Sequence, residues 1–558
     1  MKNILILFFL SIGSILAYAK INPQNDAIIN YTQVMFEVDQ IPTATSYTIY
    51  VMEKRTGIMV STQTTKSLAT MVYSNLHFGK KYTWYYKAFI QNKLLATSST
   101  YNFSISNTNL VDSTQYKYNI PQNDKKYNQN NIFFIDYLGV AINRKGEAVW
   151  YMPRNADNIK FGDSSRRSLR VTESGTFTYL DNSNCYERAL NGAVLWYAPK
   201  DGAVSGDKTE YYHHDFRKLP NSNYVACSYI TSYEKNYFDT TKFWTVKYNT
   251  LIEYDSNKKV VWVWKEKDHV DATIIFENAD VSIIDFPGTH LNGFDYDAKQ
   301  DAFICSFRNT SRVFKIDHKT GDVQFELGRY NTKLPHLATD AYTLSNQHGP
   351  AWMPNGDILI YDNNFVPNAD MVGITNPHIR IIAQPVATNQ ERQLWNYELV
   401  SDSFAKGQRG KEGVAFNMYN NNIVICQGSA NRLLEVTRNK KIVWEAFCYE
   451  YIASDSIWVG FNNYRTYAAT SLISTYFTLQ YNYVQGKKSK QTFTLNNEGT
   501  DAKQFVINYY NGTQQIKTTN LPILVKANAA ATLPVPKQCT AIQVFPLYAS
   551  SSQRTIAF

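Results

Sequence analysis

A short strand-like phrase that ends in an aromatic residue recurs six times in this 558-residue chain. Successive phrases end 46 to 70 residues apart, and most follow an apolar strand and a polar turn. A four-stranded module repeated at about 40 residues or more is typical of a β-propeller, in which each module buries its faces against its neighbours. Six modules therefore predict six blades. The phrases end at Trp150, Trp196, Trp262, Phe325, Trp395 and Trp444.

The whole chain is predicted to be all-β. Aromatic and β-branched residues are abundant, apolar runs are short, and clusters of Asn, Gly, Asp and Pro separate them. We expect residues 20–106 to form an immunoglobulin-like or fibronectin III-like sandwich, residues 107–131 a linker, and residues 132–469 a catalytic six-bladed propeller. Residues 470–558 carry no further Trp-ending phrase and resemble the strands of a small accessory sandwich.

Residues 1–19 have the pattern of a secretory signal peptide. Lys2 supplies a positive start, an apolar run follows, and residues 17–19 (Ala-Tyr-Ala) form a small-x-small cleavage site. No later stretch approaches the roughly 20 apolar residues that a spanning helix needs. We therefore expect a soluble exported protein without a membrane span, located in the periplasm if the cell has two membranes.

The charge and the cysteines exclude several kinds of function. A net charge of +9 is spread over the chain without a dense basic run, so it argues against nucleic acid and weakly favours anionic small molecules or surfaces. The cysteines form no C-x-x-C pair, which gives no indication of a zinc ribbon or a thioredoxin-type site. Most lie in apolar runs and are expected to be buried thiols, although an oxidising compartment would permit disulfides. They are Cys185, Cys227, Cys305, Cys426, Cys448 and Cys539.

Three histidines occupy similar places in successive modules. His214 lies six residues before Pro220 of one turn, and His348 lies six residues before Pro354 of another. His290 precedes an apolar strand and a slightly longer turn in the module between them. First strands of propeller modules usually line the central channel, so we expect the three imidazoles to converge at one mouth of it.

Two further polar residues are expected at the same place. Arg308 lies about nine residues beyond the hairpin tip near Lys299, which should bring it beside His290 on the neighbouring antiparallel strand. Asn292 follows His290 by two residues and points to the same side of its strand. Arginine offers a planar fork suited to sulfate, phosphate or carboxylate, whereas a neutral imidazole can act as a nucleophile. The cluster is therefore a candidate anion site.

Other interpretations of the histidines stay open. They could form a structural ring bonded to buried carbonyls, or bind a transition metal, although an arginine in the cluster opposes a cation, and we predict no metal or other cofactor. The remaining histidines lack the module register and are interpreted as structural. These are His77, His213, His269, His318, His336 and His378.

Taken in order, these motifs resemble the bacterial arylsulfate sulfotransferases, which are exported six-bladed propellers preceded by a small β-sandwich. The resemblance covers about residues 22–465. Its specific parts are His214-Asp215, His290-x-Asn292, Arg308 eighteen residues after His290, His348 before its Pro-Asn-Gly turn, and the phrases at 431–436 and 442–445 of module six.

The resemblance implies transfer of a sulfuryl group from an aryl sulfate donor to a phenolic acceptor, without a nucleotide sulfate donor. His348 would be the nucleophile that becomes transiently sulfated, which predicts ping-pong kinetics. His214, His290, Asn292 and Arg308 would hold the sulfate oxygens, and one of the other histidines would move the phenol proton. The oligomeric state stays open, a homodimer included.

Two departures from the family pattern affect details. Some members carry a hydroxyl residue at the start of module six, where this chain has Lys411-Glu412-Gly413. Some carry a close cysteine pair between the second and third histidines, where this chain has only Cys305. Two alternative functions remain: an aryl sulfate hydrolase that uses the same site, and a non-catalytic propeller that binds an anionic glycan or a protein partner.

Overall fold

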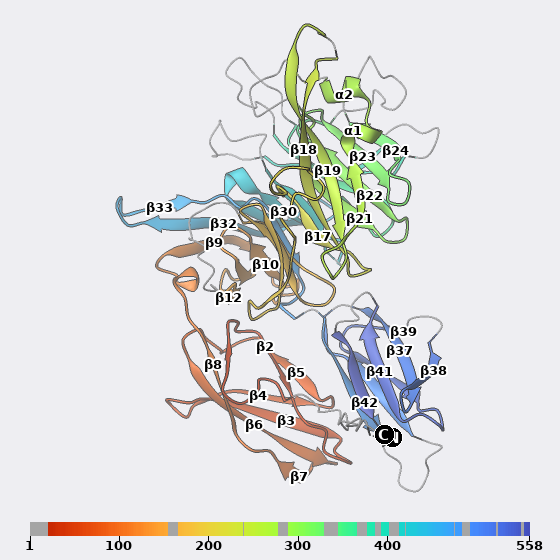
Figure 1. Ribbon diagram of the computed structural model, residues 1–558. Coiled ribbons are helices and arrows are strands. Elements are labelled where there is room, and N and C mark those ends of the chain that lie inside the picture. The colour runs from red at the N-terminus through yellow and green to blue at the C-terminus, as the bar shows by residue number, and fades with distance from the viewer. Residues whose placement is uncertain are drawn as a thin grey trace, which may run out of the picture.

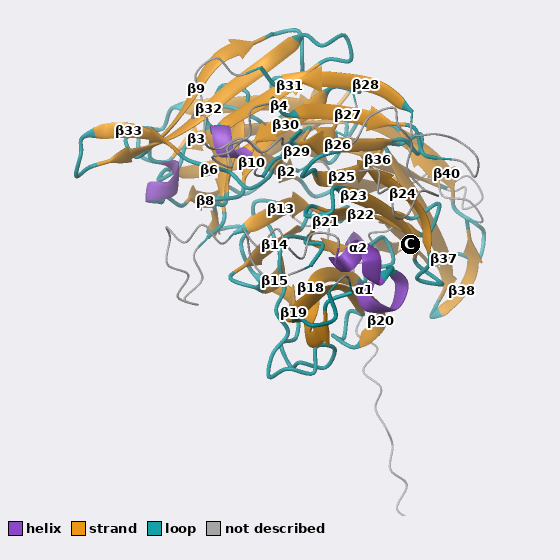
Figure 2. Ribbon diagram, turned by 90° about the horizontal axis from the view of Figure 1, so that it is seen from above, coloured by secondary structure: helices purple, strands orange, loops and turns teal. Residues whose placement is uncertain are grey.

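The computed structural model describes residues 21–153, 166–276, 288–328, 344–364, 376–385, 392–400, 412–473, 475–482, 491–547 and 552–557, apart from residues 238, 419, 501 and 520–522. Within these ranges the protein is β-structure throughout, with two short α-helices, α1 (Glu266–His269) and α2 (Ala272–Phe276), on one side of the molecule (Figure 2). The all-β prediction is confirmed. No helix in the described part is long and apolar enough to cross a membrane. The expected signal peptide and His336 lie outside the described residues.

The N-terminal strands form two sheets, drawn in red and orange at the lower left of Figure 1. One has the order β1-β8-β6-β3-β4, with β7 on β6, and the other pairs β2 with β5. Alternate residues of β3 and β6 are buried, and Phe36 packs edge-on against Trp84 with ring centroids 5.1 Å apart. The strands are β1 (Ala27–Ile29), β2 (Val34–Glu37), β3 (Ser46–Glu53), β4 (Met59–Thr65), β5 (Ala69–Val72), β6 (Lys81–Ile90), β7 (Lys93–Thr97) and β8 (Tyr101–Ile105).

The central part of the chain forms six antiparallel sheets of four or more strands. The first has β10 (Ile132–Ile135), β11 (Val140–Asn143), β12 (Ala148–Tyr151) and β34 (Thr466–Ala469). The second has β13 (Arg167–Val171), β14 (Phe177–Asp181), β15 (Asn184–Arg188) and β16 (Val194–Tyr197). The third has β17 (Phe216–Lys218), β18 (Tyr224–Lys235), β19 (Phe243–Tyr254) and β20 (Val260–Lys265).

The other three central sheets follow the same strand order. The fourth has β21 (Leu291–Asp297), β22 (Ala302–Phe307), β23 (Arg312–Asp317) and β24 (Val323–Gly328). The fifth has β25 (His348–Trp352), β26 (Ile358–Asp362), β27 (His378–Ile382) and β28 (Gln393–Glu398). The sixth has β29 (Val414–Asn417), β30 (Ile423–Gln427), β31 (Arg432–Val436), β32 (Ile442–Ile452) and β33 (Ile457–Gly460), and the short 3-10 helix η2 (Gly428–Ala430) follows β30.

Among the described strands, five of the aromatic phrases end on an edge strand of their sheet, and Trp444 lies on β32, which pairs with β31, β33 and β9. Two of these tryptophans tie one sheet to the next. Trp150 of the first sheet donates its indole N–H to the Leu190 carbonyl, 2.9 Å away in the β15–β16 turn of the second sheet. Trp444 of the sixth sheet donates to the Arg144 carbonyl at 2.9 Å, in the β11–β12 turn of the first. Trp150 and Trp444 thus each bury a ring and satisfy the indole donor across a sheet boundary.

The first sheet is completed by the far end of the central region. Strand β34 pairs antiparallel with β10, with Ile132 opposite Ala469 and Ile135 opposite Thr466. Residues 107–131, expected as a linker, contain the 3-10 helix η1 (Asn109–Val111) and β9 (Tyr116–Asn123). Because β9 pairs with β32, this segment extends the sixth sheet.

The C-terminal strands form two more sheets, drawn in blue at the lower right of Figure 1. They are β35 (Phe477–Asn482), β36 (Thr492–Asn497), β37 (Lys503–Asn511), β38 (Gln514–Thr518), β39 (Ile523–Val525), β40 (Ala529–Pro534), β41 (Ala541–Pro546) and β42 (Arg554–Ala557). Phe477 and Phe505 bring the two sheets together, with ring centroids 5.2 Å apart. Arg554 pairs with the buried Glu37 of β2, which joins the C-terminal strands to the N-terminal ones.

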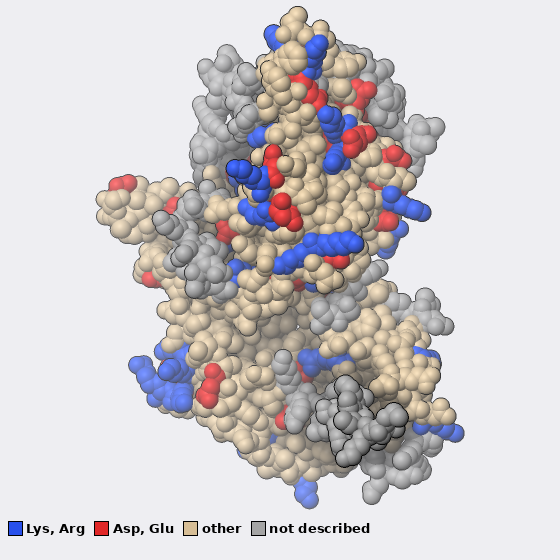
Figure 3. Space-filling model, in the orientation of Figure 1, with Lys and Arg blue, Asp and Glu red and all other residues tan. Residues whose placement is uncertain are grey.

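Charged side chains of both signs are interspersed over the upper part of the face in Figure 3. On the described part of this face, the mixture of signs differs from the single-sign stripe that tracks a nucleic acid backbone.

Candidate active site

Two of the predicted histidines are in direct contact. His214 lies just before β17 and His290 just before β21, and both have left-handed backbones, with φ values of 57° and 62°. This conformation is uncommon for residues other than glycine and is concentrated at functional sites. The two Nε2 atoms are 3.1 Å apart and the rings meet edge to face, so one nitrogen donates a hydrogen bond to the other.

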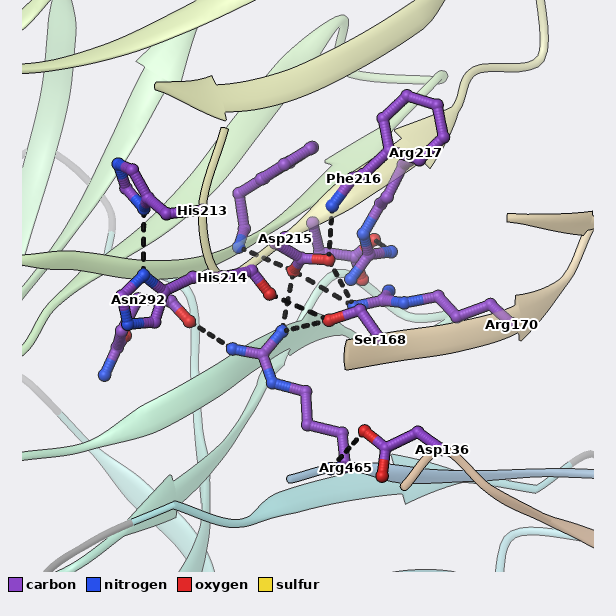
Figure 4. Close-up of polar contacts among 12 residues, drawn as sticks. Asp136, Ser168, Arg170, His213, His214, Asp215, Phe216, Arg217, Asn292 and Arg465 are labelled. Carbon is purple, nitrogen blue, oxygen red and sulfur yellow. Dashed lines mark hydrogen bonds and ion pairs between the residues drawn. The ribbon is translucent and has the colours of Figure 1, made fainter. Parts of the chain in front are cut away.

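His213, which the sequence assigned to a structural role, belongs to the same cluster. Its Nδ1 lies 2.8 Å from Nδ1 of His214, and its Nε2 lies 3.1 Å from the carbonyl oxygen of Ser228 (Figure 4). Both ring nitrogens of His214 are therefore occupied by neighbouring imidazoles. His214 has no free N–H to offer a ligand directly, unlike the role the family resemblance implies for it.

Arg308 lies beside His290, as the hairpin geometry predicted. Its backbone N–H donates to the His290 carbonyl at 2.9 Å. Its guanidinium makes one long hydrogen bond, 3.4 Å to the side-chain oxygen of Asn309. Burial lowers the pKa of Arg308, although an arginine remains charged at neutral pH. Within the described residues no carboxylate pairs with it, so this charge is available to a ligand anion.

His348 is the first residue of β25 and is almost fully buried, with 4% of its surface exposed. Its Nδ1 lies 3.0 Å from the Asn346 carbonyl oxygen and 2.7 Å from the side-chain nitrogen of Asn363. Burial, and then the charges of Arg308 and Arg465, lower the pKa of His348 well below its usual value. The ring is therefore neutral at physiological pH.

Asn292 connects the histidine pair to the His348 segment. Its side-chain nitrogen donates to the Gln347 carbonyl at 2.8 Å, directly before His348. This bond uses one of its two N–H groups and leaves the other for a ligand. The buried Asn292 side-chain oxygen has no partner among the described residues.

A buried ionic network that the sequence did not indicate underlies the histidines (Figure 4). Arg465, directly before β34, donates to Asp215 at 2.9 Å and to the Asn292 carbonyl. Asp215 also accepts from Arg170 at 2.9 Å, and both Asp215 and Arg465 have no exposed surface. Burial opposes ionisation of Asp215, but Arg170 and Arg465 outweigh it and lower the pKa of the carboxyl group. The network joins the first, second, third and fourth sheets beneath the site.

An aromatic ring held between two guanidinium groups completes the cluster. The guanidinium of Arg167 lies 4.8 Å from the ring centre of Tyr464, and that of Arg465 lies 4.9 Å from it. The Tyr464 ring is 6.1 Å from the ring of His214. Its buried hydroxyl has no hydrogen-bond partner among the described residues. Tyr464 thus presents an aromatic surface and a polar atom next to the histidines.

The cluster suits an anion better than a cation. Within the described ranges, no group of histidine, cysteine or carboxylate side chains is arranged to hold a metal ion. Burial lowers the pKa of His213 to about 4 and that of His290 to about 3, so these rings are neutral near pH 7. Neutral imidazoles beside unpaired guanidinium charge can bind a sulfate or phosphate ester and supply a nucleophile to it. Lys411, at the departure from the family pattern, lies outside the described residues.

Comparisons with known proteins identify one family. The family model described as Arylsulfotransferase (ASST) matches residues 100–381, which include His214, His290, Asn292, Arg308 and His348. No curated protein matches the chain.

Solved structures show only distant similarity. A protein of unknown function from Bacteroides caccae is 14% identical, with 61% of this chain and 98% of that chain covered and a TM-score of 0.35. A catalytically inactive virginiamycin B lyase from Staphylococcus aureus, solved with quinupristin, is 10% identical, with 59% and 87% covered and a TM-score of 0.31. At these scores the two structures assign no activity to this chain.

Proposed function

The chain belongs to the arylsulfotransferase (ASST) family, and from this premise we propose that it transfers a sulfuryl group from an aryl sulfate ester to a phenolic acceptor. Sulfuryl transfer leaves negative charge on the departing phenolate and on the sulfate oxygens. Preorganised positive groups and a source of a proton are what such a reaction requires. The histidine and arginine cluster offers both.

The environment of His348 is the observation that carries the proposal. The ring is buried, neutral and next to the Arg308 charge. When its Nδ1 donates to the Asn346 carbonyl, 3.0 Å away, the lone pair of the ring lies on Nε2. We propose that Nε2 of His348 attacks the sulfur atom of the donor.

Two contacts at Nδ1 of His348 exclude one another, and the mechanism selects between them. Nδ1 either donates to the Asn346 carbonyl or accepts from the side-chain nitrogen of Asn363, 2.7 Å away. Accepting from Asn363 would place the ring proton on Nε2 and remove the nucleophilic lone pair. The proposal therefore requires the tautomer bonded to Asn346, which also stabilises the positive ring formed on sulfation.

The reaction then has two halves. In the first, an N–S bond forms at His348, the S–O bond to the aryl group breaks, and the phenolate leaves with a proton. In the second, an acceptor phenol loses its proton, its oxygen attacks the sulfur, and the N–S bond breaks. The proton given to the phenolate in the first half is matched by the proton taken from the acceptor in the second, so one full turnover returns the protein to its starting protonation state, and the transfer is ping-pong.

The sulfate oxygens would be held by side chains whose N–H groups are not all used in contacts among the described residues. Arg308 supplies an unpaired guanidinium group, and Asn292 supplies its second side-chain N–H. His290 contributes its Nδ1, which has no partner among the described residues, once that nitrogen carries a proton. We assign His214 to supporting His290, because both of its ring nitrogens are engaged.

We also propose the architecture in which this site operates. The six central sheets would be the blades of one propeller over residues 132–469, an arrangement supported by the Trp444 bond to the first sheet and by the β10–β34 pair. Residues 20–106 and 470–558 would be flanking β-sandwiches, with 107–131 connecting. Export through removal of residues 1–19, and location in the periplasm, belong to the same proposal.

The test is a half-reaction followed by a full reaction. Purified protein mixed with 4-nitrophenyl sulfate alone should release about one equivalent of nitrophenol and gain one SO3 group on the peptide that carries His348. Added phenol should then give continuous release and phenyl sulfate. His348→Ala should show neither, whereas the matched variant His77→Ala, at an exposed position in the N-terminal part, should behave as wild type.

Other results would contradict the proposal. Continuous release without phenol indicates an aryl sulfate hydrolase. No release from any aryl sulfate indicates a binding propeller. A stable sulfate found on another residue would mean that His348 is not the nucleophile.

A further inference from the structure

Three imidazoles form a continuous chain of hydrogen bonds that ends on a backbone carbonyl. Nε2 of His290 lies 3.1 Å from Nε2 of His214, whose Nδ1 lies 2.8 Å from Nδ1 of His213. Nε2 of His213 lies 3.1 Å from the carbonyl oxygen of Ser228. Figure 4 shows the contact between His213 and His214 beside the buried ionic network.

The carbonyl fixes the direction of the chain. A carbonyl oxygen can only accept, so His213 carries its proton on Nε2 and accepts at Nδ1. His214 must then donate from Nδ1 and accept at Nε2, and His290 must donate from its own Nε2. The lone pair left over lies on Nδ1 of His290, which has no other partner among the described residues. A neutral chain is therefore ready to accept one proton at the end that adjoins Arg308.

The surroundings keep this chain neutral until an anion arrives. Burial is the largest cause that lowers the pKa of each ring, and nearby positive side chains add to it: Arg167 and Lys247 on His213, Arg167 and Arg465 on His214, and Arg308 on His290. The Tyr229 ring lies over His213 at 5.7 Å, and Tyr464 lies near His214. A bound sulfate ester would offset part of this positive charge and favour uptake of a proton.

We propose that His213 is a positioning residue of the transfer reaction, and that it holds the far end of a three-histidine relay which stores the proton for the leaving phenolate. This inference rests on the proposed function. His213 does not touch the reacting atoms; it acts through His214 and His290. The substrate-facing atom of the relay is Nδ1 of His290.

The proton balance closes over one turnover. Donor binding brings one proton from solvent, which occupies Nδ1 of His290; two transfers along the chain, from His290 to His214 and from His214 to His213, move the charge to His213, where the Ser228 carbonyl stabilises it. When the S–O bond breaks, His290 protonates the phenolate oxygen and the two transfers reverse. The acceptor phenol later gives a proton to His290 Nδ1, and that proton returns to solvent when the anionic product ester leaves.

A purely structural His213 makes a different prediction, and glutamine separates the two. The side chain of glutamine can donate to Ser228 and accept from His214, but it cannot take up a proton at neutral pH. His213→Gln should therefore preserve the geometry and lose the relay, while His213→Ala loses both. His77→Gln is the matched histidine control.

The measurement is how strongly the rate of phenol release depends on the leaving group of the aryl sulfate donor. Nitrophenolate is a good leaving group that needs little protonation, whereas unsubstituted phenolate needs a proton as it departs. For His213→Gln we expect release from 4-nitrophenyl sulfate within about threefold of wild type, and release from phenyl sulfate reduced on the order of 100-fold. Equal losses with both donors, or no loss with either, would overturn the relay.

A second measurement does not require turnover. Calorimetry of benzenesulfonate binding in two buffers of different ionisation enthalpy counts the protons taken up. Wild type at pH 7 should take up a substantial fraction of one proton, and His213→Gln much less. Binding without proton uptake overturns the relay while leaving the proposed function intact. Failure of wild type both to bind benzenesulfonate and to turn over any aryl sulfate overturns the two together.

Discussion

Arg465 and Asp215 form an ion pair 2.9 Å long with no exposed surface on either residue. The pair joins the segment before β34, near the end of the central region, to the segment before β17. Because Arg465 also donates to the Asn292 carbonyl, the same guanidinium supports two of the segments that carry site residues.

Breaking this pair should destabilise the protein strongly. Arg465→Met leaves Asp215 buried with less compensating charge, and we expect a loss of about 3–5 kcal/mol in the free energy of unfolding. Urea denaturation measures this value. The comparison is Lys242→Met, which breaks an exposed, solvent-screened pair with Asp239 and should leave the free energy of unfolding nearly unchanged. Equal effects of the two substitutions would mean that the buried pair contributes little.

Replacing Arg308 should have little effect on stability and a large effect on activity. Its guanidinium makes one long bond to Asn309, so Arg308→Ala should change the melting temperature by less than about 2 °C. Loss of the Arg308 charge expected at the sulfate should lower kcat/KM for 4-nitrophenyl sulfate by about 100-fold to 1000-fold. Arg55→Ala, at an exposed turn, is the control. A variant that keeps full activity would remove Arg308 from the site.

Stability should fall as the pH drops below about 6.5. Burial lowers the pKa of His213 to about 4 and that of His290 to about 3, while the unfolded chain binds these protons near pH 6.5. Between those values the unfolded state binds more protons, so acid favours unfolding. Melting temperatures from pH 8 to pH 5 should show the decline, and His213→Gln should make it shallower.

His318 should give stability the opposite dependence on pH in the same experiment. Burial lowers its pKa, but hydrogen bonds to Glu253 and Asp301 outweigh burial and raise it. Its stabilising effect is complete below about pH 6.5 and is lost as the pH rises through the raised value. His318→Gln should therefore cost more stability at pH 6 than at pH 8. An equal loss of stability at pH 6 and pH 8 would contradict the raised pKa of His318.

Reducing agent should have no effect on folding or activity. All six cysteines are free and buried. For Cys185, Cys227 and Cys305, burial raises the pKa of the thiol well above its usual value, which makes them poor nucleophiles. Melting curves with and without dithiothreitol should coincide. A downward shift with the reductant would reveal a disulfide that forms in the oxidised protein.

The sequence predicted the features that depend on repetition. Trp150 and Trp444 each bury a ring and pair the indole N–H with a turn of the neighbouring sheet, and a packing arrangement that recurs from sheet to sheet is visible in the sequence as a period. The contact between His214 and His290 follows from the same period, and the closeness of Arg308 to His290 follows from hairpin geometry.

The repeated pattern does not predict His213 or Arg465 at the site, and the reason is physical. His213 was assigned a structural role because register favoured its neighbour, and one strand position changes which way a side chain points. Here the left-handed backbone of His214 lets both rings enter the cluster. Arg465 belongs to no repeated phrase, and its partners on distant sheets are set by the three-dimensional arrangement alone.

The β10–β34 pair places a constraint on the order in which the protein can be made. Residues 132–135 leave the ribosome long before residues 466–469, so the first sheet keeps an unpaired edge while most of the chain is synthesised. An open strand edge is a template for wrong partners, and pairings this distant along the chain form slowly. The nascent chain therefore leaves the edge of β10 open to wrong pairing until its last central strand emerges.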